Sequence, residues 1–225
     1  MDNTSLQDIL IRSRVTILDL LDARGYETAP YRKIIGSELV KLINAPDALR
    51  IIVKSKTEPT KTAIVEYELG NIKQAVVTGA YVKSLIGEDS TKGLSMYMQD
   101  PKMTEIMVIY MTKSDNSSDD IESLNKGALE AWTKHNLKIQ FFLMVRLVNN
   151  PLKHVLQPKF EIVPNEQHGT LMGGLYIKSK SQLPVIRFHD DPVARCLGLV
   201  PLDIVKITRP SPTAGEYVEY RVCAP

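Results

Sequence analysis

The stretch IVKITRPSPTAGEYVEYRV, residues 204–222, decides the expected fold of the C-terminal part of the chain. Within it, Ile204–Arg209 and Glu216–Val222 each alternate apolar and polar side chains, which is the pattern of a half-buried β-strand. The intervening Pro210–Gly215 is rich in residues that turn the chain back. The stretch therefore predicts a β-hairpin with a longer loop.

A short helix is expected before this hairpin, over Asp190–Leu197. Asp190 is placed to accept hydrogen bonds from the first amides of the helix. Pro192 is tolerated in the first turn, where a backbone N–H has no helical partner in any case. Helix and hairpin together predict a small α+β domain.

The N-terminal part of the chain alternates helical and strand patterns. A first helix is expected to begin with Ser5 as its N-cap and to end at Gly25, and a second to begin with Ser37 and to end at Pro46. The remaining elements are expected as helices over residues 71–85 and 121–135 and as strands over residues 50–55, 62–68, 105–111 and 137–148. This order predicts an α/β domain whose mixed sheet is covered by helices.

Turn-forming residues near positions 150–160 separate the two patterns. We therefore predict one domain of residues 1–152 and a second of residues 153–225. Charge is nearly balanced in both parts: residues 1–150 carry 19 Lys+Arg and 19 Asp+Glu, and residues 151–225 carry 9 and 7. Because neither part is strongly basic, we expect contact with DNA to be local and weak.

The sequence gives little support for small-molecule chemistry. Cys196 and Cys223 are expected to be reduced and to behave as small hydrophobic residues. The four histidines lack metal-binding spacing and are expected at the surface. The chain contains no phosphate loop, dinucleotide fingerprint or catalytic serine motif, and no apolar run near the ~20 residues of a membrane span. We therefore expect an intracellular protein with no cofactor, no metal, no small-molecule substrate and no membrane contact.

One enzymatic alternative is a metal-dependent nuclease, which an α/β domain can support. Such an enzyme needs two or three acidic side chains to hold Mg²⁺ and a lysine near the attacking water. The tightest candidate is Asp100-Pro101-Lys102, with Glu105 nearby. Because proline is poorly suited to a central strand, a solvated charged loop is the better interpretation of this segment.

The tyrosines of the hairpin raise a nucleic-acid-binding alternative, in which aromatic rings stack on bases. Tyr217 and Tyr220 are three residues apart, which places them on opposite faces of a strand. They therefore cannot form one stacking platform, and we expect at least one of them to have a packing role. A free DNA-binding regulator stays open as an alternative and would bind DNA with salt-sensitive affinity.

A series of short motifs runs in order along the C-terminal part of the chain. The motifs are Gln182-Leu183-Pro184, Asp191-Pro192-Val193-Ala194-Arg195, Val205-Lys206-Ile207, Arg209-Pro210-Ser211, Thr213-Ala214-Gly215-Glu216-Tyr217 and Tyr220-Arg221. This series resembles the assembly module of the fifth shared subunit of eukaryotic RNA polymerases, whose archaeal counterpart is little more than that module. The opening helix, which ends in Arg24-Gly25-Tyr26, is also similar to the start of that family.

The resemblance implies a non-catalytic subunit of a multisubunit DNA-dependent RNA polymerase. Its N-terminal α/β jaw domain would lie beside downstream DNA, and its C-terminal α+β assembly module would dock on the largest subunit. Other subunits would be further partners, and polymerase catalysis would belong to the large subunits. The protein would act in the nucleus if it is cellular, and at a cytoplasmic replication site or in the virion if it is viral.

The motif residues divide into two expected groups. An apolar group would build the small core of the module: Pro192, Val193, Ala194, Val205 and Ile207. A second group is expected to contact partner subunits, because arginine and tyrosine commonly dominate such interfaces: Arg195, Lys206, Arg209, Thr213, Gly215, Tyr217 and Arg221.

The sequence departs from the family pattern at three places. The module would begin at Val163-Pro164, but the helix that follows in the family is not expected, because the two glycines of Thr170–Ser179 cost about 1 kcal/mol each in a helix. Val185 replaces a basic residue, and Leu202 replaces a glycine. Because leucine resists a positive φ, Pro201-Leu202 is expected to turn differently. These departures suggest a divergent member, from a virus or an unusual eukaryote.

Overall fold

A computed structural model describes residues 3–34, 36–42, 46–69, 100–111 and 118–225 of the chain. The chain divides into two compact units, Met1–Asn150 and Pro151–Pro225. Each unit contains a four-stranded sheet of its own.

The first unit is an α/β unit with a mixed sheet. Its elements are α1 Asn3–Ala23, α2 Ala29–Arg32, α3 Ser37–Lys41, α4 Pro46–Leu49, β1 Ile51–Lys54, β2 Thr62–Glu68, β3 Thr104–Tyr110, α6 Ser118–His135 and β4 Lys138–Leu143. The strand order is β1-β2-β3-β4, with β1 antiparallel to β2 and the other pairs parallel. The predicted mixed sheet with flanking helices is confirmed.

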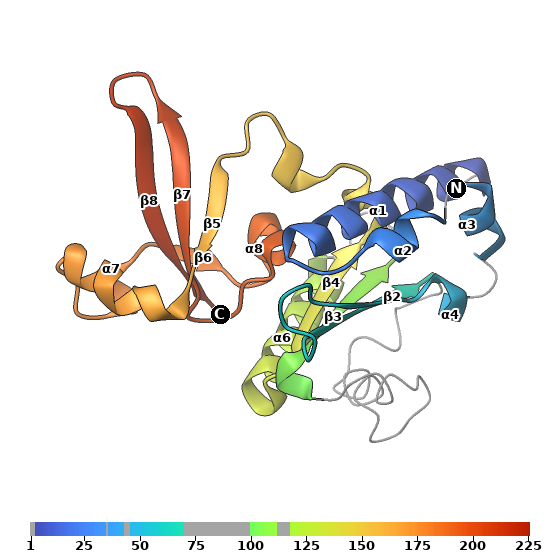
Figure 1. Cartoon of the computed structure of the whole chain (residues 1–225), viewed down its shortest axis with the longest axis horizontal. Helices are drawn as coiled ribbons and strands as arrows, with labels where there is room; N and C mark the ends of the chain where they lie inside the picture. Colours follow the sequence, from blue (N-terminus) through green and yellow to red (C-terminus); the bar gives the residue numbers. More distant parts are fainter. Residues whose placement is uncertain (1–2, 35, 43–45, 70–99, 112–117) are drawn as a thin grey trace. The chain divides into compact units, whose positions relative to one another are not determined.

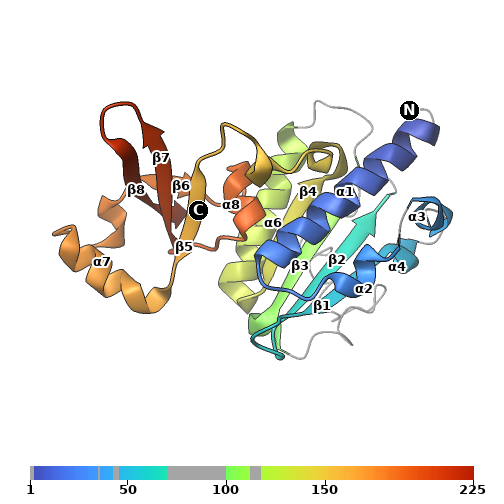
Figure 2. The same ribbon diagram turned by 45° about the horizontal axis from the view of Figure 1, so that its top comes forward.

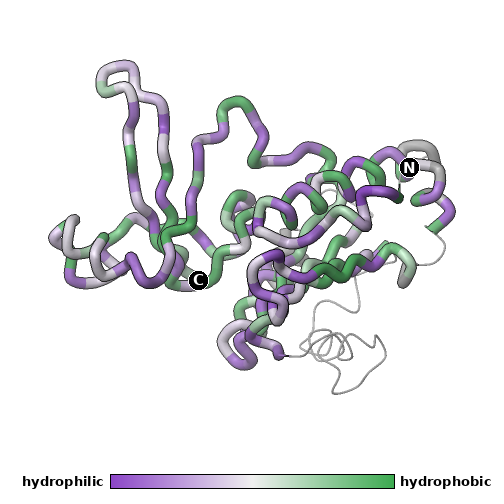
Figure 3. The backbone as a smooth tube through the Cα atoms, in the orientation of Figure 1, coloured by the Kyte–Doolittle hydropathy of each residue, from purple (hydrophilic) through white to green (hydrophobic). Residues whose placement is uncertain are grey.

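β3 shows how completely this sheet is covered, because all seven of its residues are buried. A strand that is buried at every position needs cover on both faces. Figures 1 and 2 show α1 over one face of the sheet and α6 over the other. α6 also forms the long crossover that allows β3 and β4 to run parallel. The apolar character of these strands appears as green stretches in Figure 3.

Two helix boundaries of the first unit differ from the prediction. α1 begins at Asn3, so Ser5 lies inside the helix and is not its cap. α3 ends at Lys41, and Pro46 opens α4, where its missing N–H costs no helical hydrogen bond. Gly25 follows α1 with φ +85°, as expected for a glycine that ends a helix. The helix expected over residues 71–85 lies outside the described residues.

The last strand of the first unit is shorter than predicted. β4 ends at Leu143, and the apolar run continues as a 3₁₀ turn over Met144–Leu147. Met144 and Leu147 are buried in that turn. An apolar run alone does not distinguish a buried strand from a buried turn, which explains the error.

The second unit is an α+β unit built on its own mixed sheet. Its elements are β5 Lys159–Val163, α7 His168–Gly174, β6 Val185–Arg187, α8 Pro192–Leu197, β7 Ile204–Ser211 and β8 Gly215–Ala224. The strand order is β5-β7-β8-β6, in which β6 is parallel to β8 and the other pairs are antiparallel. One side of the sheet packs around Leu183, Ile204 and Val222, with Tyr220 against them, so the packing role expected for one tyrosine is confirmed.

The predicted hairpin is confirmed as β7–β8, but its loop is shorter than expected. Pairing continues to Ser211 opposite Gly215, so only three residues lie between the strands. Gly215 has φ +74°, a left-handed conformation that suits glycine at a tight reversal. The cap of α8 is also shifted by one residue: the Asp191 carboxylate, not that of Asp190, accepts from the Val193 and Ala194 amides at 2.7 and 3.1 Å.

Two expectations about the backbone of the second unit were wrong. α7 does form, and its glycines, Gly173 and Gly174, stand in its last turn, where the helix is about to end. Tyr176 follows with φ +55°, and its amide and that of Ile177 close the helix by donating to Gly173 and Met172. Leu202 adopts φ +76° despite its side chain, so the turn keeps the geometry that a glycine would take. Its amide donates to the Cys223 carbonyl at 2.9 Å, which holds this conformation.

Candidate protein-binding surface

The β7–β8 hairpin carries most of the residues that the sequence assigns to partner contacts. Arg209, Gly215 and Tyr217 are exposed, and Arg221 is half-buried. Alternate residues of β8 point the same way, so Gly215, Tyr217 and Arg221 share one face. Arg209 lies on that face too, because it pairs with Tyr217 across the strands. We call these four residues the hairpin face.

Electrostatics on the hairpin face centres on Glu219. One oxygen of its carboxylate, Oε1, accepts from Arg209 Nη2 at 3.0 Å and from Arg221 Nε at 3.2 Å. The two arginine side chains remain 46% and 34% exposed. Ion pairs this exposed contribute little to stability. One carboxylate shared by two guanidinium groups leaves a net positive charge beside the exposed ring of Tyr217.

Lys206 lies on the opposite face of the sheet from these residues. It pairs with Tyr220 on β8 and with Glu161 on β5, and its ammonium is 3.9 Å from the Glu161 carboxylate. Glu161 is also hydrogen-bonded to Lys159 at 2.6 Å, which lowers the pKa of Glu161 and raises that of Lys159. The predicted contact residues therefore do not form one surface.

Thr213 and Arg195 complete the predicted set, at two other places. Thr213 is exposed at the tip of the hairpin, 3.4 Å from the Ser211 hydroxyl. Arg195 lies on α8 and is only 9% exposed, so it does not join the hairpin face. The expected core residues Val193, Ala194, Val205 and Ile207 are buried, as predicted. Pro192 is exposed, which the prediction missed, because the first position of α8 faces solvent.

Several exposed apolar side chains were not predicted as contact residues. In the second unit they include Val155, Leu156, Ile162, Tyr176, Leu202 and Val218. Ile162 and Val218 follow the alternation of their strands, so a strand assignment for β5 would have placed Ile162. The two side chains lie on opposite faces of the sheet, because Ile162 pairs with Val205 and Val218 pairs with Thr208. Alternation does not reveal whether other segments of the chain cover either face.

Histidines and cysteines are mostly internal in the second unit. His168 and His189 are buried, so the expected surface position was wrong for both. His168 Nε2 lies 3.0 Å from the Val163 carbonyl and ties α7 to the end of β5. Cys196 and Cys223 are free thiols, as predicted, and both are buried. Burial raises the pKa of the Cys223 thiol to about 12.

The first unit holds its charges inside, around Glu105 on β3. This carboxylate pairs with Arg24 and Lys138 and accepts a hydrogen bond from the Tyr26 hydroxyl at 3.1 Å. Arg24 also donates to the Gln140 amide oxygen at 2.9 Å. Burial raises the pKa of Tyr26 to about 12. With two cations at its oxygens, the Glu105 carboxylate is committed to the interior of the unit.

Asp100, the other acid of the nuclease alternative, is also in use. Its carboxylate accepts from the Lys102 amide at 2.9 Å and caps an exposed 3₁₀ turn, Pro101–Met103. The segment is therefore an exposed charged turn, as predicted. Across the described residues, no group of three or more His, Cys, Asp or Glu side chains is placed to hold a metal ion. Nor does any helix within the described ranges have the length and apolarity to cross a membrane.

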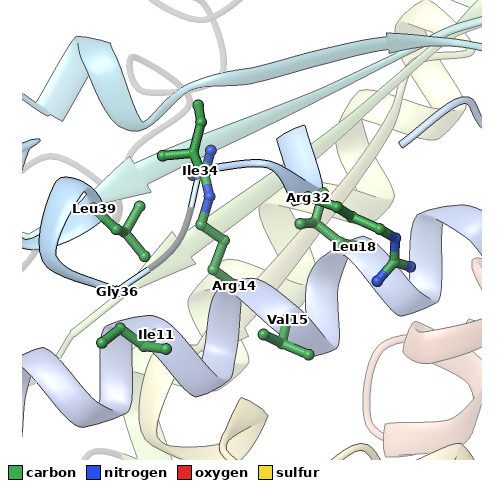
Figure 4. A pocket seen from close by; sticks show the side chains of 8 residues that line it. All are labelled: Ile11, Arg14, Val15, Leu18, Arg32, Ile34, Gly36 and Leu39. Carbon is green, nitrogen blue, oxygen red and sulfur yellow. The ribbon is translucent and has the colours of Figure 1, made fainter. Parts of the chain in front are cut away.

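A small pocket lies between α1 and the α2–α3 segment of the first unit (Figure 4). Its lining is mainly apolar and includes Ile11, Val15 and Leu18 from α1. The Arg14 side chain crosses it, and the guanidinium donates to the Leu49 carbonyl at 2.8 Å. Burial lowers the pKa of Arg14. The volume of the pocket, about 100 Å³, is well below that of typical small-molecule sites, so the pocket is a poor candidate for an active site.

Comparisons with known proteins agree with the motif series. The family model described as RNA polymerase Rpb5, C-terminal domain, matches residues 149–223. The match begins before Val163-Pro164, so the predicted start of the module was wrong. β5 explains this, because it begins at Lys159, four residues before that dipeptide, and is part of the sheet.

Similar proteins cover both units. The Caenorhabditis briggsae protein named DNA-directed RNA polymerases I, II, and III subunit RPABC1 is 27% identical over 222 residues, which are 95% of this chain and 94% of that protein. The Dictyostelium discoideum protein of the same name is also 27% identical, over 97% of this chain and all of that protein. DNA-directed RNA polymerase subunit Rpo5 of Archaeoglobus fulgidus is 51% identical over 69 residues, which are 31% of this chain and 88% of that protein. The chain belongs to the Rpb5/Rpo5 family of RNA polymerase subunits.

Proposed function

We propose that this chain is a structural, non-catalytic subunit of a multisubunit DNA-directed RNA polymerase and acts in transcription. The observation that carries the proposal is its similarity to named polymerase subunits along 95% of its length. Polymerase catalysis would belong to the large subunits, and this subunit needs no cofactor of its own.

The two units would divide the work. In the Archaeoglobus relative, the 69 residues similar to this chain make up 88% of the protein, and the Rpb5 C-terminal domain model matches residues 149–223 of this chain. This supports a role for residues 153–225 as an assembly module that docks on the largest subunit. Residues 1–152 would then form part of the jaw beside downstream DNA. Their balanced charge, 19 Lys+Arg and 19 Asp+Glu within residues 1–150, fits a weak DNA contact made only within the complex.

The hairpin face is the part of the second unit best suited to dock on a partner. Tyr217 offers a large ring at 55% exposure, and Arg209 and Arg221 add guanidinium groups that share one internal carboxylate. Thr213 at the tip would extend this surface. Lys206 would contact a different partner surface, and Arg195 would act from within α8.

The cellular site of action follows from the partner enzyme. The eukaryotic relatives are subunits of polymerases I, II and III by name, so a cellular protein of this kind would work in the nucleus. A viral member would work at a cytoplasmic replication site or be carried in the virion.

Native affinity purification of the tagged chain from its source tests the function directly. We expect two chains several times larger than this one to co-purify, together with small partners. Mass spectrometry of those chains would identify the polymerase. Recovery of the protein alone, in salt gentle enough to preserve assemblies, would contradict the proposal.

Single substitutions test the docking surface in the same assay. Arg221→Ala and Arg195→Ala should each lower the amount of large subunits recovered with the tagged chain. Arg187→Ala is the matched control, because this arginine of β6 is 75% exposed and lies off the hairpin. Normal recovery with both Arg195 and Arg221 changed would remove these residues from the interface. Because Arg195 is buried, its variant also needs a stability measurement to show that it folds.

A further inference from the structure

The outer part of the β7–β8 hairpin stands clear of the rest of its sheet. β5 pairs with β7 only as far as Thr208, and β6 pairs with β8 only over Val222–Ala224. Residues 209–217 therefore form a two-stranded ribbon that pairs with no other strand in the described part of the chain, which we call the arm. Figures 1 and 2 show it projecting from its unit. An isolated two-stranded ribbon is only marginally stable. The arm can thus open locally while the buried part of β7 stays in place.

The arm contains a serine followed by a proline, Ser211-Pro212. This is the only Ser-Pro or Thr-Pro dipeptide in the 225 residues. Pro212 restricts the preceding residue to extended backbone, and Ser211 is the last residue of strand β7. Proline also has no N–H to donate. A binding groove that needs that N–H cannot take this segment, whereas a groove with an apolar recess for the proline ring can.

The Ser211 hydroxyl is held only by long contacts within its own turn. Its oxygen accepts from the Ala214 amide at 3.3 Å and lies 3.4 Å from the Thr213 hydroxyl. The residues that follow it, 212–218, are all exposed. Modest movement of the tip is therefore enough to free the hydroxyl. If Ser211 served only to stabilise the turn, its hydroxyl would have to accept a hydrogen bond, but neither Pro212 nor a nearby cation would be needed.

A cation is available two residues earlier. Arg209 and Ser211 alternate on the same strand, so their side chains lie on the same face of the arm. Arg209 shares the Glu219 carboxylate with Arg221 and is half exposed. A doubly charged anion on Ser211 would compete well for this guanidinium, because arginine binds phosphate oxygens by charge-assisted hydrogen bonds.

We infer that Ser211 is a phosphorylation site for a proline-directed serine/threonine kinase that uses Mg-ATP. In the reaction the Ser211 oxygen attacks the γ-phosphorus, a new O–P bond forms, and the bond from the γ-phosphorus to the bridging oxygen breaks. ADP leaves with that electron pair, and a base of the kinase takes the hydroxyl proton. Phosphoserine on the arm then binds Arg209 in place of Glu219. If the proposed docking role of the hairpin face holds, the added negative charge weakens docking on the partner.

Phosphorylation of the purified full-length chain tests the inference without any polymerase. The chain is incubated with a cyclin-dependent kinase and Mg-ATP, and intact mass and peptide mass spectrometry follow the product. We expect one phosphoryl group, located on Ser211. Ser211→Ala should abolish it, and Pro212→Ala should lower its rate roughly tenfold or more, because one lost specificity contact has an effect of that size. Thr170→Val, at an exposed threonine of α7 outside the arm, is the control and should leave the rate unchanged.

Two outcomes would overturn the inference. One is no incorporation under conditions that fully modify a synthetic Ser-Pro peptide. The other is a Pro212→Ala variant that is phosphorylated as fast as the original chain. Because the experiment uses the chain alone, neither outcome bears on membership of a polymerase.

A second readout tests the contact with Arg209. In a ³¹P NMR titration of the phosphorylated chain, the guanidinium should favour the dianion and lower the second pKa of the phosphate. Arg209→Gln should raise that pKa toward the value of a phosphoserine peptide. Equal titration curves for the two proteins would reject Arg209 as the phosphate-binding residue.

Discussion

β3 of the first unit and β8 of the second are both inner strands of four-stranded sheets, yet they meet different surroundings. Every residue of β3 is buried, whereas only Val222 and Cys223 of the ten residues of β8 are. Glu105 on β3 is 3% exposed and pairs with Arg24 and Lys138, while Glu219 on β8 serves two arginines that remain accessible. The charges of the first unit are thus committed to its own fold, and those of the hairpin face are available to a partner.

The largest effect is expected from Glu105→Gln. Removing this charge leaves Arg24 without its buried counter-ion, and breaking a buried pair from one side costs about 3 kcal/mol or more. Urea unfolding measures the loss of unfolding free energy. The single tryptophan, Trp132 on α6, makes fluorescence a specific probe of the first unit.

Asp22→Asn is the matched control for that substitution. Asp22 is paired with Lys56 at 2.7 Å in the same unit, but both side chains are about half exposed. Solvent screens such a pair, so no measurable change in unfolding free energy is expected. If Asp22→Asn and Glu105→Gln lower the unfolding free energy by similar amounts, the buried and the exposed ion pairs do not differ in their contribution to stability.

Alkaline pH should destabilise the first unit through its buried tyrosines. Burial raises the pKa of Tyr67 to about 12. In the unfolded chain a tyrosine loses its proton near pH 10, so between about pH 10 and 12 ionisation favours the unfolded state. Below pH 10 both states are protonated and this contribution is constant. The expected loss by pH 12 is about 2–3 kcal/mol for one such tyrosine.

Tyr67→Phe isolates that contribution. The variant should lose less unfolding free energy than the original chain between pH 10 and 12 in urea titrations followed by Trp132 fluorescence. The second unit should respond earlier, because the pKa of Cys223 is raised from 9.0 to about 12 and its window opens near pH 9. If the unfolding free energy of the first unit does not change up to pH 12, Tyr67 ionises as readily in the folded chain as in the unfolded chain, and its pKa is not raised by folding.

Much of the fold followed from sequence patterns because those patterns reflect local physics. The strands β2, β3, β7 and β8 were all predicted. A strand buried on both faces, such as β3, has a continuous apolar run, and a strand buried on one face, such as β7, alternates apolar and polar residues. β5 was missed, because its five residues are mostly exposed and its pairing with β7 depends on segments far apart in the chain. The alternation in β5, Lys159-Phe160-Glu161-Ile162, spans only four residues, which is too short to distinguish an edge strand from a loop.

The candidate surface was predictable only in part. The motif series selected the hairpin, and alternation sorted Tyr217 from Tyr220. The same alternation places Lys206 and Arg209, three residues apart on β7, on opposite faces, which the predicted contact set did not take into account. The burial of Arg195 depends on tertiary packing, which a short motif does not reveal.

The same sorting yields a smaller, paired prediction within β8. Tyr220 packs against the cluster of Leu183, Ile204 and Val222, so Tyr220→Ala should cost the second unit about 2 kcal/mol. Tyr217 is exposed on the other face, and Tyr217→Ala should change its stability by less than about 0.5 kcal/mol. Hydrogen exchange with mass spectrometry on β7 and β8 peptides measures both. A large loss for Tyr217→Ala would mean that its ring supports the fold, and its assignment to a partner surface would weaken.

The smallest effect is a gain, expected from Leu202→Gly. Leu202 holds φ +76°, which costs an L-residue about 1–2 kcal/mol, and its side chain is 64% exposed, so little apolar burial is lost with it. Glycine gives back part of the gain, about 0.5–1 kcal/mol, through the greater freedom of the unfolded chain. The second unit should therefore be stabilised by up to about 1 kcal/mol, seen as slower exchange of the Cys223 region, to which Leu202 is hydrogen-bonded. Gly25→Ala is the opposite change in the first unit at φ +85°, and it should destabilise. If Leu202→Gly also destabilises the second unit, the buried part of the leucine side chain stabilises the fold by more than the positive φ costs. Exposure alone would then be a poor reason to assign the exposed apolar residues of this unit to a partner surface.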